Sequence, residues 1–388
     1  MHYLDNAATS WPKPEAVYTT LDQSFRSLFS PKRGTSKASR LGANQLQEAR
    51  NAVASLCNIA NPERISFTNG CTHALNLAIQ AFPWQTGDAV VMSAVEHHAL
   101  SRPIRKIARE KGIEFYVVPY TDAVPFNLAE YENLLKTRPN IKLVATTHAS
   151  NVIGSVLPVE QIGNLAHQYG KLYLLDAAQS AGVLPVDVQR FHIDMLALPG
   201  HKSLYGPPGI GALYVGDNVD LNTFMEGGTG GDSGKHEMHP TPPDGFEVGT
   251  IPLPQILALA EGIKWVQETG LSKIHQHETE LLAQLIAGLQ EIPEVTIYGH
   301  TDVALKTPVV SFNLLNHTPK SVGETLFDDY GIALRAGFHC APMAHEAIGS
   351  IHRGGTVRAS IGAFTQPDDV DALIKALKSV LSQSLAAL

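Results

Sequence analysis

The stretch ALPGHKSLYGPPGIG, residues 197–211, decides how this chain is interpreted. Apolar segments flank it, FHIDMLAL before and GALYV after, and both are predicted to be strands. Between them, Lys202 lies in a loop rich in glycine and proline. A lysine at a strand end can be desolvated, which lowers its pKa and makes its amine a nucleophile or a Schiff-base former. The alternative interpretation is a solvated loop lysine.

A second signal lies upstream, in KLYLLDAAQ at residues 171–179, which reads as a buried strand ending in Asp176. In open α/β sheets, ligands bind at the carboxyl ends of the strands, so Asp176 and Lys202 are expected at the same edge. A carboxylate and an amine in this arrangement meet two needs of pyridoxal phosphate: an acid partner for the ring nitrogen and an amine for the aldehyde. The pair therefore favours an enzyme that uses this cofactor.

Four motifs extend the pattern, and they read HASN at 148–151, DAAQ at 176–179, GHK at 200–202 and RAGFHCAP at 335–342. In this order and spacing they resemble the cysteine desulfurase and selenocysteine lyase family, fold-type I pyridoxal-phosphate enzymes of aminotransferase class V, nearest to group II. The resemblance runs from YLDNAATSWPKP at the N-terminus to GTVRASIGAF near the C-terminus. It implies an α/β fold: a large domain with a mainly parallel seven-stranded sheet between helices, and a smaller α+β C-terminal domain.

The order of the predicted elements agrees with this fold. Strands and helices alternate with short connections after residue 64, which predicts a mainly parallel sheet covered by helices. The expected domains are an N-terminal segment packing with the small domain, a large cofactor-binding domain and a small C-terminal domain, at residues 1–14, 15–252 and 253–388. SPKRGTSKASR at 30–40 is predicted to be a basic loop before an amphipathic helix, whose Cys57 is expected in the core.

Composition excludes several classes of protein. The chain has 388 residues, of which 44% are hydrophobic and 17% charged, as in an ordinary globular protein. A net charge of −8 argues against a nucleic-acid surface, and no apolar run of about 18 residues predicts a membrane span. Three cysteines and a start without a secretory pattern favour a reducing compartment, so a cytoplasmic location is expected.

The cofactor phosphate is expected at residues 64–82, which read as strand, glycine turn and helix. Such a turn directs backbone N–H groups at an anion, so Cys71 and Thr72 form the candidate cradle; an ordinary strand-to-helix turn is the alternative. One departure from the family is Pro199, where a serine or threonine is usual, so one phosphate hydrogen bond is missing or supplied elsewhere. The resemblance implies the other contacts to the cofactor: His97 stacked on the ring, Asn151 beside it, Gln179 at the phenolic oxygen, His201 at the phosphate, and Thr250 reaching the phosphate of the partner subunit in a homodimer with shared sites.

Two arginines are candidates for the substrate carboxylate, because arginine offers a bidentate cation. Arg358 in GTVRAS matches the family motif and Arg335 is a neighbour; salt-bridge arginines are the alternative. Asn151 is the third residue assigned to the substrate. Cys340 lies in RAGFHCAPMAH, a loop with glycine, histidine and proline beside an arginine, where cationic neighbours favour the thiolate. The alternative is a structural cysteine.

The resemblance implies the reaction. Cys340 attacks the sulfur of L-cysteine and holds it as a persulfide for an acceptor protein, while the carbon skeleton leaves as L-alanine. Lys202 is the general base and acid, and His97 and Asp176 complete the catalytic set. Three alternatives stay open: a cysteine or cystine C–S β-lyase, a selenocysteine lyase acting on L-selenocysteine, and a catalytically silent cofactor-binding protein.

No metal is expected. The adjacent histidines of VEHHAL, at residues 95–100, point apart and have no Cys or Asp pair beside them. The pair His236 and His239 lies in a segment rich in glycine and proline, which is predicted to be a loop near the active site.

Overall fold

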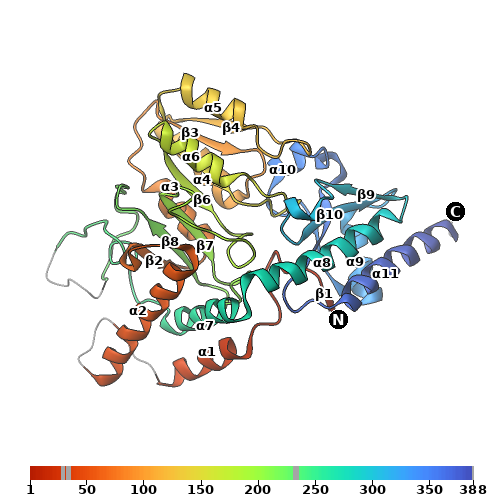
Figure 1. Ribbon diagram of the computed structural model, residues 1–388, viewed down its shortest axis with the longest axis horizontal. Helices are drawn as coiled ribbons and strands as arrows, with labels where there is room; N and C mark the ends of the chain where they lie inside the picture. The colour runs from red at the N-terminus through yellow and green to blue at the C-terminus, as the bar shows by residue number, and fades with distance from the viewer. Residues whose placement is uncertain (28–30, 32–35, 230–235, 387–388) are drawn as a thin grey trace.

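The computed structural model describes residues 1–27, 31, 36–229 and 236–386, and its centre is a seven-stranded sheet (Figure 1). The strand order is β2-β8-β7-β6-β5-β3-β4. Strand β8 is antiparallel to both of its neighbours, whereas the other neighbouring pairs are parallel. The prediction of a mainly parallel sheet is confirmed. The strands are β2 (Ile65–Thr68), β3 (Ala89–Ser93), β4 (Glu114–Val118), β5 (Ile141–Thr147), β6 (Leu172–Asp176), β7 (Met195–Pro199) and β8 (Gly211–Val215).

Helices cover both faces of this sheet because its strands are apolar on both sides. In β6, Tyr173 and Leu175 belong to one buried cluster, while Leu174 between them belongs to the other. The first cluster includes residues of α2, α5, α6 and α7, and the second includes residues of α3 and α4. The helices of this part are α1 (Glu15–Ser27), α2 (Lys37–Cys57), α3 (Cys71–Gln80), α4 (His98–Lys111), α5 (Leu128–Thr137), α6 (Val159–Gln168) and α7 (Leu253–Thr269).

A second, antiparallel sheet of four strands lies in the C-terminal part of the chain, in the order β12-β13-β10-β9. Its strands are β9 (Val295–Tyr298), β10 (Val309–Leu314), β12 (Arg335–Gly337) and β13 (Thr356–Ser360). The helices around it are α8 (Leu271–Gln290), α9 (Pro319–Tyr330), α10 (Pro342–Ala347) and α11 (Pro367–Ala386). In Figure 1, α7 and α8 follow each other above α1, from below the large sheet toward the small one.

The N-terminus joins this second part. Strand β1 (His2–Tyr3) pairs in parallel with β11 (Ile332–Ala333) in a separate two-stranded sheet. The segment IALRAG reads as one strand in the sequence, but the structure divides it at Leu334 into β11 and β12, which belong to different sheets.

The basic segment at residues 30–40 is only partly a loop. Helix α2 begins at Lys37, and the side chain of Ser36 caps it by accepting a hydrogen bond from the backbone N–H of Ser39. Its first residues are mostly polar, so their helical period does not show in the sequence. Residues 30 and 32–35 of the predicted loop lie outside the described residues. Cys57 at the end of α2 is fully buried, as expected.

The loop that carries Lys202 is fixed by close backbone packing. A Cβ on Gly182 would lie 2.1 Å from the carbonyl oxygen of Ser203, and one on Gly262 would lie 2.2 Å from that of Leu204. Only glycine permits these approaches. The loop is therefore held from both sides at the end of β7.

Candidate active site

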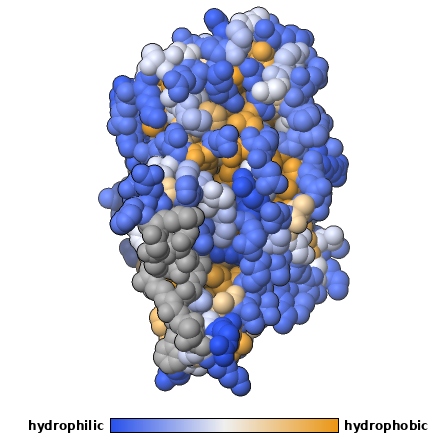
Figure 2. All heavy atoms as spheres, turned by 90° about the vertical axis from the view of Figure 1, so that its left-hand side faces the viewer, coloured by the Kyte–Doolittle hydropathy of each residue, from blue (hydrophilic) through white to orange (hydrophobic). Residues whose placement is uncertain are grey.

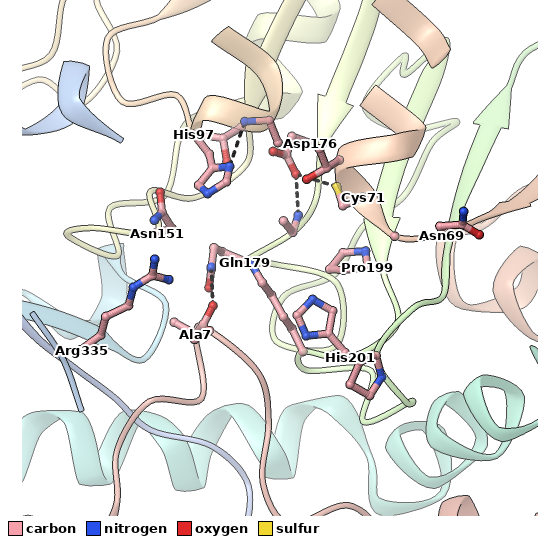
Figure 3. Close-up of a pocket in the computed structure, with 18 of the residues that line it drawn as sticks. Ala7, Asn69, Cys71, His97, Asn151, Asp176, Gln179, Pro199, His201 and Arg335 are labelled. Atoms are coloured by element: carbon pink, nitrogen blue, oxygen red, sulfur yellow. Dashed lines mark hydrogen bonds between the residues drawn. The ribbon is translucent and has the colours of Figure 1, made fainter. Parts of the chain in front are cut away.

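A cavity of about 310 Å³ opens at the carboxyl ends of β6 and β7 (Figure 3). Its walls come from the N-terminal segment, the turn before α3, the start of α4, the Lys202 loop and strands β12 and β13. Of the predicted site residues, those that line it are Cys71, Thr72, His97, Asn151, Asp176, Gln179, His201, Lys202, Arg335 and Arg358. Two predicted residues, Cys340 and Thr250, are not part of the wall.

Asp176 is oriented by two donors. Its Oδ1 accepts the backbone N–H of Ala178 at 2.9 Å and the thiol of Cys71 at 3.3 Å, as Figure 3 shows. Burial raises the pKa of Asp176, while the Ala178 N–H, the charge of Lys202 and the Cys71 thiol oppose that rise. The other oxygen, Oδ2, accepts no hydrogen bond from the described residues. A buried carboxylate with one open oxygen fits a protonated ring nitrogen.

Lys202 is held through its backbone. Its carbonyl oxygen accepts the hydroxyl of Ser10 and the backbone N–H of Tyr205, both at 2.8 Å. Burial lowers the pKa of the Lys202 amine. Asp176 and Cys71 raise this pKa, whereas the positive charges of Arg358 and Arg335 lower it further. The amine is therefore biased toward its neutral, nucleophilic form.

An anion site is formed where α3 begins. Gly70 precedes the helix with φ +128° and no side-chain cap, and among the described residues nothing accepts the N–H groups of Cys71 and Thr72. His201 lies in the same wall, and burial, with Lys202 and Lys13, lowers its pKa to about 4. A neutral imidazole and free helix N–H groups suit a phosphate. Pro199 lines this wall without a hydroxyl, as the sequence indicates.

His97 is a neutral ring in the cavity wall. Its Nδ1 accepts the backbone N–H of Ala99 at 3.0 Å and so caps α4, which places the ring proton on Nε2. Burial, together with Lys202 and other nearby cations, lowers the pKa of His97 to about 3. The preceding residue, Glu96, is fully buried and accepts the N–H of Thr147 at 2.9 Å. Glu96 therefore ties the His97 segment to the end of β5.

The side of the cavity near the N-terminus contains a contact that the sequence analysis missed. Arg358 donates from Nη2 to Asp5 Oδ1 at 2.7 Å and from Nη1 to the carbonyl oxygen of Asn151 at 3.0 Å. Arg358 is 1% exposed, and its Nε is buried without a partner among the described residues. Burial lowers the pKa of Arg358, and Asp5 opposes this. The unpartnered Nε leaves Arg358 able to accept a further anion.

Two other buried groups complete this side. The Oδ1 of Asn151 is also without a partner among the described residues, while its Nδ2 donates to the carbonyl oxygen of His339 at 2.7 Å. Gln179 donates from Nε2 to the carbonyl oxygen of Ala7 at 3.1 Å. The sequence YLDNAAT could have indicated Asp5, because it places a carboxylate at the end of a short predicted strand. The local sequence does not indicate that Arg358 is its partner.

Cys340 lies beside the cavity and is exposed. Arg335, which lines the wall, donates to its Sγ at 3.5 Å. The Cys340 carbonyl oxygen accepts the N–H of His98, the first residue of α4, at 2.8 Å, so the positive end of that helix faces the loop. His339 and Cys340 have φ +49° and +58°, a conformation that non-glycine residues rarely adopt. The loop is thus a fixed turn with an accessible thiol next to a cation.

Other expectations lie away from this cavity. Thr250 is exposed on the loop before α7, and its contact with a partner subunit stays a prediction. In the described part of the chain, no group of three or more His, Cys, Asp or Glu side chains is placed to hold a metal ion. His236 and His239 are among the residues to which this applies. The predicted loop at 225–250 falls partly on residues 230–235, outside the described residues. Within the described ranges, every helix is too short or too polar to cross a membrane.

Comparison with known proteins gives a consistent result. Residues 2–373 match the aminotransferase class-V family. A probable cysteine desulfurase of Mycolicibacterium paratuberculosis is 34% identical over 97% of this chain, which spans only 55% of that relative's length. A probable cysteine desulfurase of Pyrococcus abyssi is 33% identical over 98% of this chain and 94% of the relative. The apo structure of a cysteine desulfurase from Thermococcus onnurineus matches with a TM-score of 0.90 and 31% identity, over 98% of this chain and 94% of that one.

Proposed function

The chain belongs to the aminotransferase class-V family, and from that premise we propose that it is a cysteine desulfurase acting on L-cysteine. The reaction moves the substrate sulfur to Cys340. The Cβ–S bond breaks with its electron pair on carbon, an S–S bond forms to Sγ, and a proton replaces sulfur on Cβ. The products are L-alanine and a Cys340 persulfide, so no external oxidant is needed.

The family implies pyridoxal phosphate, and the residues present fit it. The phosphate is assigned to the N–H groups of Cys71 and Thr72 and to His201, the ring nitrogen to the open oxygen of Asp176, and the aldehyde to Lys202. His97, Asn151 and Gln179 are assigned to the ring and its phenolic oxygen. When bound, the cofactor supplies an aldehyde for the substrate amine and a ring that delocalises the electrons left at Cα.

The chain's own residues do the remaining work. Arg358, held by Asp5 and the carbonyl oxygen of Asn151, is assigned to the substrate carboxylate through its unpartnered Nε. The amine of Lys202 takes the Cα proton at Nζ and later returns a proton to the substrate. Arg335, whose Nη2 lies 3.5 Å from Sγ, is assigned to the Cys340 sulfur, and the N–H of His98 at the start of α4 holds the backbone of the loop through the Cys340 carbonyl oxygen.

The observation that carries the proposal is the position of Cys340. A structural cysteine would be buried, as Cys57 is, whereas Cys340 is exposed, fixed in an unusual backbone conformation and 3.5 Å from an arginine of the cavity wall. Among the described residues, the cavity contains a lysine, a buried aspartate and a buried arginine that suit an amino-acid substrate.

The test measures products from L-cysteine with a reductant, for the wild type, Cys340→Ala and the control Cys57→Ala. We expect alanine from the wild type and the control, and a loss on the order of 10²-fold or more in Cys340→Ala, because the nucleophile is gone. Pyruvate and ammonia from both the wild type and Cys340→Ala would assign a C–S β-lyase instead. Alanine from L-selenocysteine alone would assign a selenocysteine lyase.

The remaining assignments belong to the same proposal. The domain division is residues 1–14, 15–252 and 253–388, supported by two sheets formed from separate parts of the chain. A homodimer is supported by hydrophobic residues exposed on one largely hydrophilic face of the molecule (Figure 2). The contact of Thr250 with the partner's phosphate and the cytoplasmic location rest on the family resemblance and the composition of the chain. A protein that accepts sulfur from Cys340 is also part of it.

A further inference from the structure

Helix α4 carries a basic face that begins beside Cys340. Arg102, Arg105, Lys106 and Arg109 lie within an arc of about 100° at 3.6 residues per turn. All four side chains are exposed. We call this set the α4 basic face.

Two contacts place its near end at the Cys340 loop. The N–H of His98 donates to the carbonyl oxygen of Cys340, and Nη2 of Arg105 lies 3.5 Å from Sδ of Met343, three residues after that cysteine. Burial lowers the pKa of His98, and the charges of Arg102 and Arg105 add to this effect. Because an α-helix rises about 1.5 Å per residue, the face extends roughly 10 Å from Arg102 to Arg109, and its far end lies roughly 16 Å along the helix from His98.

The charge of this face is largely uncompensated. Arg102 and Arg109 form no ion pair with any carboxylate in the described parts of the chain, and the Lys106–Glu110 pair is long, at 4.0 Å. Glu110 on the same helix and Glu346 on α10 are the exposed acidic residues of these two helices. The chain as a whole has a net charge of −8, so this cluster opposes the average charge of the surface. Such a local field attracts anionic partners.

We propose that the α4 basic face docks an acidic segment of the protein that takes the sulfur from Cys340, a segment that carries its own thiol. This inference rests on the proposed function. The acceptor thiolate attacks the outer sulfur of the Cys340 persulfide, the S–S bond breaks, and Cys340 leaves as a thiolate. Sulfur and charge balance without an oxidant or reductant. Phe338, which is 44% exposed and two residues before Cys340, offers an apolar contact at the same place.

A thiol-bearing protein explains the arrangement better than a nucleic acid does. The basic face leads to a cysteine whose sulfur must be removed by a nucleophile, and a thiol performs that exchange directly. A nucleic-acid surface would need positive charge across several elements, whereas this charge is confined to one helix of an acidic chain.

The test uses the holoenzyme and two synthetic peptides, one with cysteine between glutamates and one with cysteine between lysines. The persulfide is formed with L-cysteine, and the rate of sulfur transfer to each peptide is measured. We expect the acidic peptide to react about 10-fold faster at low salt, an advantage lost at 0.5 M salt. The triple variant Arg102→Gln/Arg105→Gln/Arg109→Gln should bring the ratio close to one.

A control variant removes the same charge elsewhere. Lys273→Gln/Lys320→Gln/Lys375→Gln, on exposed positions of α8, α9 and α11, should keep the wild-type ratio. Both triple variants should retain alanine formation with a neutral reductant. An equal ratio in the wild type and the Arg variant would overturn the proposal, as would an equal loss in the control.

A second readout separates this proposal from the proposed function. In the resting enzyme, the reaction of Cys340 with an anionic aromatic disulfide is compared with that of a neutral dipyridyl disulfide. If the anionic disulfide reacts faster than the neutral one, and the Arg variant loses this difference, the basic face attracts anions to Cys340. This result would support the inference even if L-cysteine gave no persulfide, because the missing persulfide would contradict only the proposed function. If a short oligonucleotide inhibited transfer at a lower concentration than the acidic peptide does, the face would bind nucleic acid and the inference would be wrong. If the ratio of the two peptide rates changed with protein concentration, the face would bind a second copy of this chain, which would also overturn the inference.

Discussion

The ion pair between Asp5 and Arg358 offers a direct test of how the site is held. Asp5→Asn keeps the shape of the side chain but removes the charge opposite a guanidinium that is 1% exposed, across a contact of 2.7 Å. Breaking a fully buried pair costs about 3–5 kcal/mol, because the remaining charge stays buried and uncompensated. Asp5 is 21% exposed, so water compensates part of that loss, and we expect about 2–3 kcal/mol.

This cost converts to a change in melting temperature. At ~2.1 cal/mol/K per residue, the 388 residues have an unfolding entropy of roughly 0.8 kcal/mol/K, so the variant should melt about 3 °C lower if the chain unfolds as one unit. The assay is thermal unfolding of the cofactor-free protein. Asp22→Asn is the matched control, since Asp22 pairs with Arg26 on the exposed face of α1 and its loss should leave the melting temperature unchanged.

A carboxylate added in solution tests the same site from the substrate's side. Propionate has a carboxylate but no amine, so it can occupy the anion position at Arg358 without reacting. It should raise the melting temperature of Asp5→Asn more than that of the wild type. An Asp5→Asn protein as stable as Asp22→Asn, with no extra response to propionate, would refute the argument that Asp5 compensates the buried guanidinium.

Three further predictions concern other parts of the fold. Gly163→Ala should destabilise the protein by more than about 2 kcal/mol in urea unfolding, since the new Cβ would lie 1.8 Å from the carbonyl oxygen of Phe191; an unchanged midpoint would contradict this packing. Burial raises the pKa of Glu96 from 4.5 to about 8, so the folded state holds its proton more tightly and stability falls as pH rises from about 4.5 to 8. Between pH 5.5 and 7.5, the free energy of unfolding should therefore fall by about 2–3 kcal/mol more in the wild type than in Glu96→Gln. If the two proteins lost stability equally over this range, the raised pKa of Glu96 would be wrong. Cys71→Ala removes the thiol donor to Asp176 and should weaken pyridoxal-phosphate binding about fivefold in a fluorescence titration, with Cys71→Ser restoring it; equal affinities of the two variants would exclude the role of the donor.

Much of the site could be predicted because its signals are local. Asp176 ends one apolar strand and Lys202 follows another, and the rule that ligands bind at the carboxyl ends of strands brings the two together without knowledge of the sheet order. The phosphate turn before α3 is equally local, since strand, glycine and helix follow one another within a few residues. These features need only hydrophobic pattern and turn chemistry.

Two of the three missed features depend on contacts between distant parts of the chain. Asp5 meets Arg358 across 353 residues, and no short pattern could pair them. The start of α2 was missed for another reason: its first turn is stabilised by the Ser36 cap and shows no apolar period. The division at Leu334 follows from two sheets meeting there, which local propensity does not encode.

The pairing of β1 with β11 has a consequence for synthesis on the ribosome. Strand β1 and Asp5 are made before their partners, Ile332–Ala333 and Arg358, which emerge more than three hundred residues later. At roughly 5–20 residues per second, the N-terminal segment waits between about 20 and 70 s for them. Until then the nascent chain has its lysine loop but neither of the cavity's two arginines, Arg335 and Arg358. The enzyme therefore becomes competent late in synthesis, when β11 and Arg358 meet the segment that carries β1 and Asp5.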